Sequence, residues 1–138
     1  KPTPRAKTKQ TKAFPPSVFP CDIFLAPPYA GNGELYQSLA VAALSNGCAI
    51  LHPDPGFEFN MGSALVRMIG PQRTDYTSDN DRSLCIKIQY GDTRFLICGD
   101  AQHESEIDLV NCSEDLSADV YVVNHHGSNT SSTYVFLR

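Results

Sequence analysis

Two short apolar runs in the second half of the chain each end in side chains that can bind metal ions. Ile97-Cys98 leads to Gly99-Asp100, and residues 120–124 lead to His125-His126-Gly127-Ser128. A carboxylate can bridge two divalent cations, and a neutral imidazole can complete the shell of one of them, so that a bound water is deprotonated near neutral pH. The sequence therefore predicts a polar site where two neighbouring strands end.

The three side chains have separable roles in such a site. We expect Asp100 to bridge the ions and His125, the first residue past its predicted strand, to bind the second ion, because a rigid strand end fixes an imidazole better than a loop. His126 would then face the substrate or donate a proton, and the opposite assignment of the two histidines stays open. Asp100 could instead cap the helix that follows it.

The elements that must position these residues alternate between strands and helices. Apolar patterning predicts a short buried strand over 22–26, further strands over 48–51 and 64–69, and a helix over 33–45 that ends at Asn46-Gly47. Residues 83–90 alternate apolar and polar side chains, Gly91-Asp92 forms a turn, and residues 93–98 return as the second arm, which predicts a hairpin. A short amphipathic helix over 102–112 and a strand over 118–124 follow, and residues 133–138 have the pattern of a helix cut off in progress.

Composition bounds the class of protein. Hydrophobic residues make up 41% and charged residues 19% of 138 residues, and no apolar run approaches the roughly 18 residues of a membrane helix. We therefore expect neither a membrane segment nor a signal peptide, and a cytoplasmic location. Five cysteines without a Cys-x-x-Cys pair indicate buried, reduced thiols rather than a disulfide framework or a zinc knuckle.

Charge divides the chain into two parts. Residues 1–12 hold five of the eleven basic residues and no acid, whereas residues 13–138 hold the other six against all fifteen acids. We interpret 1–20 as a linker or disordered arm and 21–138 as one partial domain. The arm could also contact nucleic-acid phosphates non-specifically.

A series of motifs from residue 80 onward has the order and spacing of a known family. The motifs are Asn80-Asp81-Arg82-Ser83, Gly99-Asp100, Glu104 with Glu106, Ala118-Asp119-Val120, and His125-His126-Gly127-Ser128 followed by Asn-Thr-Ser-Ser at 129–132. With these motifs, the region resembles the C-terminal half of a metallo-β-lactamase-fold hydrolase, most closely the ComEC-type branch, which is named for the soluble domain of a bacterial DNA-uptake protein.

The resemblance implies an α/β fold, namely the latter part of an αββα sandwich with a mixed, mostly antiparallel sheet and flanking helices. It also implies two divalent ions, Zn²⁺ or Mn²⁺, and hydrolysis of a phosphodiester in nucleic acid or a nucleotide. The family's first metal motif, His-x-His-x-Asp-His, is absent here; His52-Pro53-Asp54 matches it only in part. A preceding segment of the same protein would therefore complete the site.

Three weaker candidates complete the predicted site. Asn80 and Ser83 match the family's site-edge positions and could contact substrate, although an Asx turn that opens the hairpin explains them equally well. Ser128 leads into a helix start whose N–H groups could hold a substrate phosphate, or it could simply cap that helix. His103, beside Glu104 in the first turn of a helix, is expected to be exposed rather than a ligand.

Two other functions are compatible with the sequence. The chain could be a non-catalytic interaction module that keeps the fold without the chemistry. It could also be a nucleic-acid-binding protein that works through its basic arm, although the acidic remainder argues against a broad phosphate-binding face.

Overall fold

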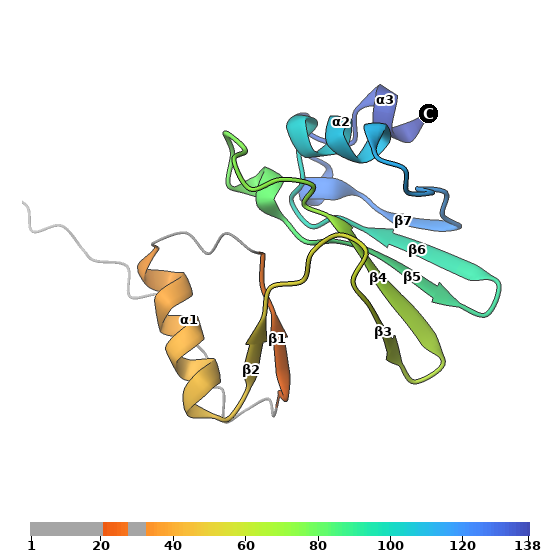
Figure 1. Cartoon of the computed structure of the whole chain (residues 1–138). Coiled ribbons are helices and arrows are strands. Elements are labelled where there is room, and N and C mark those ends of the chain that lie inside the picture. Colours follow the sequence, from red (N-terminus) through yellow and green to blue (C-terminus); the bar gives the residue numbers. More distant parts are fainter. Residues whose placement is uncertain (1–20, 28–32) are drawn as a thin grey trace, which may run out of the picture. The chain divides into compact units, whose positions relative to one another are not determined.

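The computed structural model describes residues 21–27 and 33–138, in two compact units (Figure 1). The described residues of the first unit are 21–24 and 33–50, and those of the second are 25–27 and 51–138. The predicted arm over 1–20 lies outside the described residues. Within the described part, no helix is long and apolar enough to cross a membrane.

The first unit is built around a strand, a helix and a strand: β1 (Ile23–Leu25), α1 (Glu34–Ser45) and β2 (Ala49–Leu51), with β1 and β2 forming a two-stranded sheet. The helix ends as predicted, because Gly47 adopts a φ of +76° that favours glycine while its N–H bonds to the Leu44 carbonyl at 3.0 Å. The prediction that the first strand is buried is wrong for Ile23, which is 54% exposed. A sheet of only two strands offers too little area to enclose both of its faces.

The second unit contains a five-stranded sheet in the order β3 (Glu58–Met61), β4 (Ala64–Gly70), β5 (Cys85–Tyr90), β6 (Thr93–Ile97) and β7 (Val120–Val122). The first four strands are antiparallel, and β7 runs parallel to β6. The α/β class and the mixed, mostly antiparallel sheet are thus as predicted. The finer expectation of an αββα sandwich stays a prediction.

Strand β3 is an element that the sequence analysis did not predict. It pairs with β4 across Gly62-Ser63, where Gly62 has a φ of +61°. The signal was the alternation of Phe57, Phe59 and Met61 with polar residues, which is short and lies between Pro55-Gly56 and Gly62-Ser63. The β5–β6 hairpin, by contrast, has the predicted two-residue turn at Gly91-Asp92.

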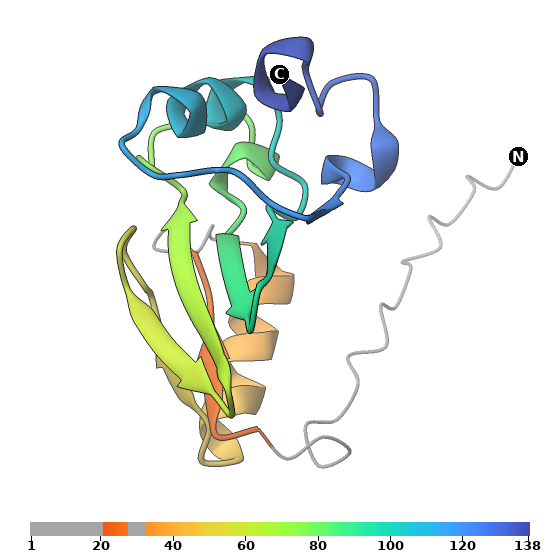
Figure 2. The same ribbon diagram turned by 90° about the vertical axis from the view of Figure 1, so that its right-hand side faces the viewer.

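The core of the second unit lies between the sheet and α2 (His103–Asn111), with α3 (Tyr134–Leu137) beside it. Figure 2 shows α2 and α3 next to each other at one end of the sheet. The fully or almost fully buried members of this core are Ile69, Cys85, Leu96, Cys98, Ala101 and Leu109. Packing of α2 against β4 and of Tyr121 and Phe136 against the same cluster fixes the segments that leave β6 and β7.

Two short 3₁₀ helices, η2 (Asn80–Arg82) and η3 (Asn124–Gly127), adjoin this end of the sheet. Strand β7 ends at Val122, so the prediction that the strand continues to Asn124 is wrong. His125 is therefore in η3 rather than directly after a strand. The physical reason is that Asn124 turns its side chain to a buried carboxylate on α2 and leaves the sheet ladder.

Candidate functional site

The parallel pair β6 and β7 places the predicted ligands at equivalent positions. Ile97 pairs with Val122 at the ends of the two strands, and Asp100 and His125 each lie three residues further along. The His125 N–H donates to the Gly99 carbonyl at 2.9 Å, so the two chains remain side by side beyond the sheet. The strand register therefore brings the two predicted ligand segments together at the C-terminal ends of β6 and β7.

A glycine and a serine fix the main chain at Asp100. Gly99 has a φ of +55°, and a Cβ at this position would lie 3.2 Å from the Ser83 Cβ, so both its conformation and its surroundings require glycine. The Ser83 hydroxyl accepts the Asp100 N–H at 3.1 Å. Ser83 thus contacts the main chain of the predicted bridging residue, and its role as a substrate contact stays a prediction.

Asp100 does not cap the helix that follows it. The first turn of α2 is capped by Asp81 of η2, whose buried carboxylate accepts the Gln102 N–H at 2.8 Å and the Ser105 N–H at 3.0 Å. The alternative interpretation of Asp100 as an N-cap is therefore wrong. Its carboxylate, with a side chain 43% exposed, is left for another partner.

The Asp100 carboxylate lies beside the imidazole of His126. The His126 Nε2 lies 3.5 Å from the Asp100 Oδ1, and the His126 side chain is 89% exposed. The two histidine rings are in edge contact with centroids 6.2 Å apart. All three predicted residues thus lie at one edge of the sheet, with His126 open to solvent.

His125 is held by neutral side chains that the sequence analysis did not single out. Its Nδ1 lies 2.9 Å from the Gln102 Nε2 and 3.4 Å from the Thr130 Oγ1. A metal-binding imidazole usually has its second ring nitrogen fixed by a hydrogen-bond partner. If Nε2 of His125 binds an ion, Nδ1 carries the proton, and the Gln102 amide must present its oxygen to it.

The backbone of the two histidines is strained. His125 and His126 have φ values of +48° and +55°, a left-handed conformation that costs side-chain-bearing residues about 1–2 kcal/mol each. Contacts of the preceding Asn124 stabilise this turn. Its N–H donates to the Tyr121 hydroxyl at 3.2 Å, and its carbonyl accepts the Ser131 hydroxyl at 2.9 Å.

Glu106 of α2 connects the two ends of the histidine loop, which we define as residues 124–133. Its fully buried carboxylate accepts Asn124 Nδ2 at 2.9 Å, the Ser132 N–H at 2.5 Å and the Thr133 N–H at 2.9 Å. None of the three donors is a cation. Glu106 therefore joins the residue before His125 to the start of α3.

This arrangement bears on the predicted phosphate contact at Ser128. The N–H groups of Ser132 and Thr133, which could have faced an anionic substrate, are already bonded to Glu106. The Ser128 hydroxyl lies 3.0 Å from the Thr130 hydroxyl and within the same loop. The role of Ser128 as a substrate contact stays a prediction.

The remaining sequence candidates lie as follows. Asn80 begins η2, and its N–H bonds to the Ser78 hydroxyl at 3.3 Å. His103 is exposed in the first turn of α2. The His52 Nδ1 lies 2.9 Å from the Pro27 carbonyl.

The described residues hold no group of three or more His, Cys, Asp or Glu close enough to bind a metal ion. Residues 1–20 and 28–32 contain none of these residue types. Asp100, His125 and His126 therefore fit part of a coordination shell and not a complete one. Any further ligands of these kinds must come from outside the chain or from rearrangement within it.

A groove of about 440 Å³, lined by residues of polar and charged types, adjoins His125 and shares Gln102 and Thr130 with it. The other lining residues are Thr77, Ser78, Asp81, His103, Glu104, Asn129 and Thr133. The lining contains no Lys or Arg. An anionic group bound here would thus depend on other positive charge for its neutralisation.

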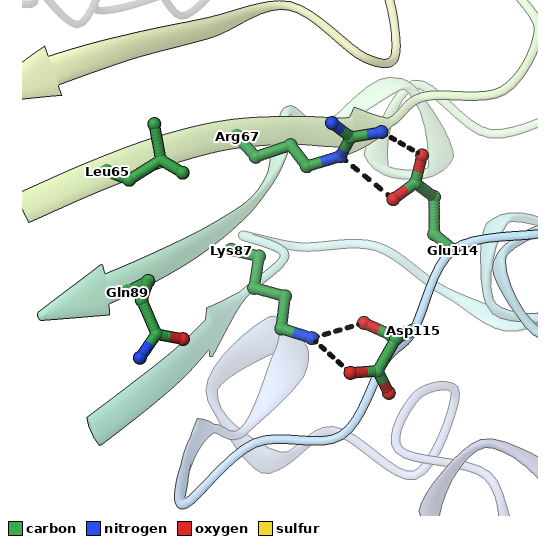
Figure 3. A pocket seen from close by; sticks show the side chains of 6 residues that line it. All are labelled: Leu65, Arg67, Lys87, Gln89, Glu114 and Asp115. Carbon is green, nitrogen blue, oxygen red and sulfur yellow. Dashed lines mark hydrogen bonds and ion pairs between the residues drawn. The ribbon is translucent and has the colours of Figure 1, made fainter. Parts of the chain in front are cut away.

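A second hollow, of about 320 Å³, lies on the polar face of the sheet (Figure 3). Arg67 makes a bidentate salt bridge with Glu114, with N–O distances of 2.7 and 2.9 Å. The Lys87 Nζ lies 3.0 Å from the Asp115 carboxylate. The hydrogen bond with Arg67 lowers the pKa of Glu114. Both cations of this hollow are paired, so they hold the loop before β7 rather than an external anion.

Comparison with known proteins places the chain among relatives of competence proteins. It is 37% identical over 110 residues to competence protein ComA of Neisseria gonorrhoeae, covering 79% of this chain and 14% of that protein. It is 29% identical over 102 residues to ComE operon protein 3 of Bacillus subtilis (strain 168), covering 74% of this chain and 13% of the relative. No family model matches. The chain thus spans about a seventh of either relative, and these matches support its relation to ComEC-type competence proteins.

Proposed function

We propose that this chain supplies part of a metal-dependent hydrolase site that cleaves a phosphodiester of nucleic acid in a protein of DNA uptake. The observation that carries the proposal is the meeting of Asp100, His125 and His126 where the parallel strands β6 and β7 end. The relation to competence proteins supports DNA as the substrate class.

Each side chain has a task that its surroundings support. The Asp100 carboxylate does not cap a helix and can therefore bind an ion. The imidazole of His125 is oriented through its Nδ1 by Gln102 and Thr130. Imidazole and carboxylate together suit Zn²⁺ or Mn²⁺. Such ions, when bound, would neutralise the phosphate and lower the pKa of water. His126, solvent-exposed and beside Asp100, would move a proton to the leaving group.

The proposal requires ligands from elsewhere. Two or three side chains leave most of two coordination shells to be filled, and the chain offers no further cluster among its described residues. We place the missing ligands in a preceding segment of the same protein. The groove beside His125 lacks Lys and Arg, which is consistent with phosphate binding that depends on metal ions.

The test uses the protein with its preceding segment and the 138-residue chain alone. Both are dialysed against Zn²⁺ or Mn²⁺, and metal content and cleavage of bis(p-nitrophenyl) phosphate and single-stranded DNA are measured. We expect stoichiometric metal and cleavage only in the longer protein. Asp100→Asn should abolish both, whereas Asp92→Asn, an equivalent change in the exposed β5–β6 turn, should leave them unchanged.

Two outcomes would contradict the proposal. A longer protein that binds neither ion and cleaves nothing would be the non-catalytic interaction module. Salt-dependent DNA binding that disappears on removal of residues 1–12 and does not need Asp100 would support the nucleic-acid-binding alternative.

A further inference from the structure

Two cysteines of the first unit lie side by side. The Cys48 thiol donates to the Cys21 sulfur at 3.3 Å, although the two residues are 27 positions apart in the chain. Both are free thiols in this structure. No sequence pattern predicts this contact, because the contact depends on how β1 and β2 pair.

Strand pairing explains why the two sulfurs meet. The Ala49 N–H donates to the Asp22 carbonyl at 2.8 Å, which joins the chain at the start of β1 to the start of β2. Cys21 and Cys48 are the residues immediately before Asp22 and Ala49. Neighbouring strands lie about 4.8 Å apart, within the Cα separation of about 4.4–6.8 Å that a disulfide accepts.

We propose that Cys21 and Cys48 form an oxidation site, at which a small-molecule disulfide converts the two thiols into a bond that joins the starts of β1 and β2. Cys21 is exposed and can be reached by a reagent, whereas Cys48 is only 4% exposed. The pair thus has one accessible sulfur and one that only its neighbour can reach.

The reaction proceeds by two exchange steps. The Cys21 thiolate attacks one sulfur of the small-molecule disulfide, a mixed disulfide forms, and the first small thiol leaves with a proton. The Cys48 sulfur, after losing its proton to water, then attacks the Cys21 sulfur and releases the second small thiol. Two protein thiols are oxidised and one disulfide is reduced.

The protonation of Cys48 is consistent with this order. Burial raises the pKa of its thiol, and the hydrogen bond with Cys21 raises it further. The thiolate is the attacking form, so the buried thiol is not the first to react with an external reagent. It reacts once Cys21 carries a leaving group next to it.

A second cysteine pair provides an internal comparison. Ile86 pairs with Ile97, so Cys85 and Cys98 are also opposite each other, and both are 0% exposed. The hydrogen bond with Cys98, together with burial, holds the pKa of Cys85 well above its ordinary value. No reagent can reach this pair in the folded chain, and we expect it to remain reduced.

The experiment treats the folded 138-residue chain with oxidised glutathione near pH 8 and counts thiols after unfolding in denaturant. We expect the count to fall from five to three, with no retained glutathione. Glu34 is the one glutamate between Cys21 and Cys48. After the thiols are blocked and the chain is cut by a Glu-specific protease, the two flanking fragments should therefore stay joined until a reductant is added.

Two variants sharpen the result. Cys48→Ser should stop the reaction at the first step and leave one glutathione on Cys21. Cys85→Ser should still form the bond, with two thiols left. Persistence of all five thiols, a stable glutathione adduct on the unchanged chain, or a bond that includes Cys85, Cys98 or Cys112 would overturn the proposal.

Discussion

The two ends of the β6–β7 pair use charge in opposite ways. Where these strands start, Arg94 contacts the Asp119 carboxylate at 3.2 Å, and the preceding loop is held by Arg67–Glu114 and Lys87–Asp115. Where they end, the side chains of Asp100 and His126 are partly and largely exposed, respectively, and lie 3.5 Å apart. The ion pairs at the starts hold the loop, whereas the exposed side chains at the ends are those of the candidate site.

A second contrast lies among the three carboxylates near the C-terminal ends of these strands. Asp81 and Glu106 are buried carboxylates whose oxygens accept backbone N–H groups, while Asp100 is neither buried nor used in this way. Carboxylates that are satisfied by buried donors hold structure. Asp100, the proposed metal ligand, differs from both because its carboxylate accepts none of these backbone N–H groups.

The largest effect is expected for Glu106→Gln. One oxygen becomes an amide, so a buried N–H loses its acceptor at a cost of about 2–3 kcal/mol, and the strained histidine turn is released. Urea unfolding should show the loss of stability. In a sample labelled with ¹⁵N-histidine, which has only four histidines, the His125 and His126 amide signals should move and that of His52 should not.

Glu104→Gln is the control for that experiment. Glu104 is on the same helix, but its carboxylate bonds to Arg73 at 2.9 Å. It should leave the His125 and His126 signals in place. Equal shifts in both variants would show that the helix as a whole, rather than Glu106, sets the turn.

Gly99→Ala should come next. It forces alanine into a φ of +55° and brings a Cβ to 3.2 Å from Ser83. Gly91→Ala has the same φ problem at +56° with open space around it, so it measures the backbone cost alone. We expect Gly99→Ala to be more destabilising by about 1 kcal/mol, as measured by thermal unfolding. If the two variants were equally stable, the close approach of Ser83 would not matter.

A smaller effect is expected for Ser83→Ala. The variant removes the acceptor for the Asp100 N–H, and the loss of one such hydrogen bond costs about 0.5–1.5 kcal/mol. Hydrogen exchange of the Asp100 amide should become faster while that of the strand amides in β5 is retained. Unchanged protection would mean that water or another group replaces the hydroxyl.

We expect the smallest effect on stability for Glu114→Gln, which removes the charge that pairs with Arg67 in the loop before β7. The folded pKa of Glu114 lies below its ordinary value, so its contribution to stability is present above that ordinary value and is lost as pH falls through the lower, folded one. The difference in urea midpoint between wild type and variant should therefore be small at pH 7 and vanish in acid. It should also shrink in high salt. A difference that grew in acid would contradict the pairing.

The sequence predicted those parts of the fold that follow local patterns. The β5–β6 hairpin was predicted because residues 83–90 alternate and a Gly-Asp turn follows them, and α2 because its apolar residues recur at helical spacing. Strand β3 was missed because its alternation is short and flanked by turn residues. The end of β7 was misplaced because residues 120–123 are uniformly strand-like and do not show that Asn124 turns toward Glu106.

The sequence indicated the proposed ligands of the candidate site, but not the residues that position them. Asp100, His125 and His126 have residue types that indicate metal chemistry wherever they lie. Gln102, Asp81 and Glu106 have ordinary types, and their roles come from contacts with residues 18–24 positions away. No local pattern encodes such contacts, so they become visible only in the folded chain.

The parallel pairing of β6 with β7 has a consequence for the order in which the protein is built. The antiparallel strands β3 to β6 join neighbours in the chain, but β7 reaches β6 only after the crossover through α2 has closed. Pairing between distant segments forms more slowly than a hairpin. During synthesis, Asp100 therefore leaves the ribosome before the histidines, and the proposed site is assembled only after the sheet that carries it.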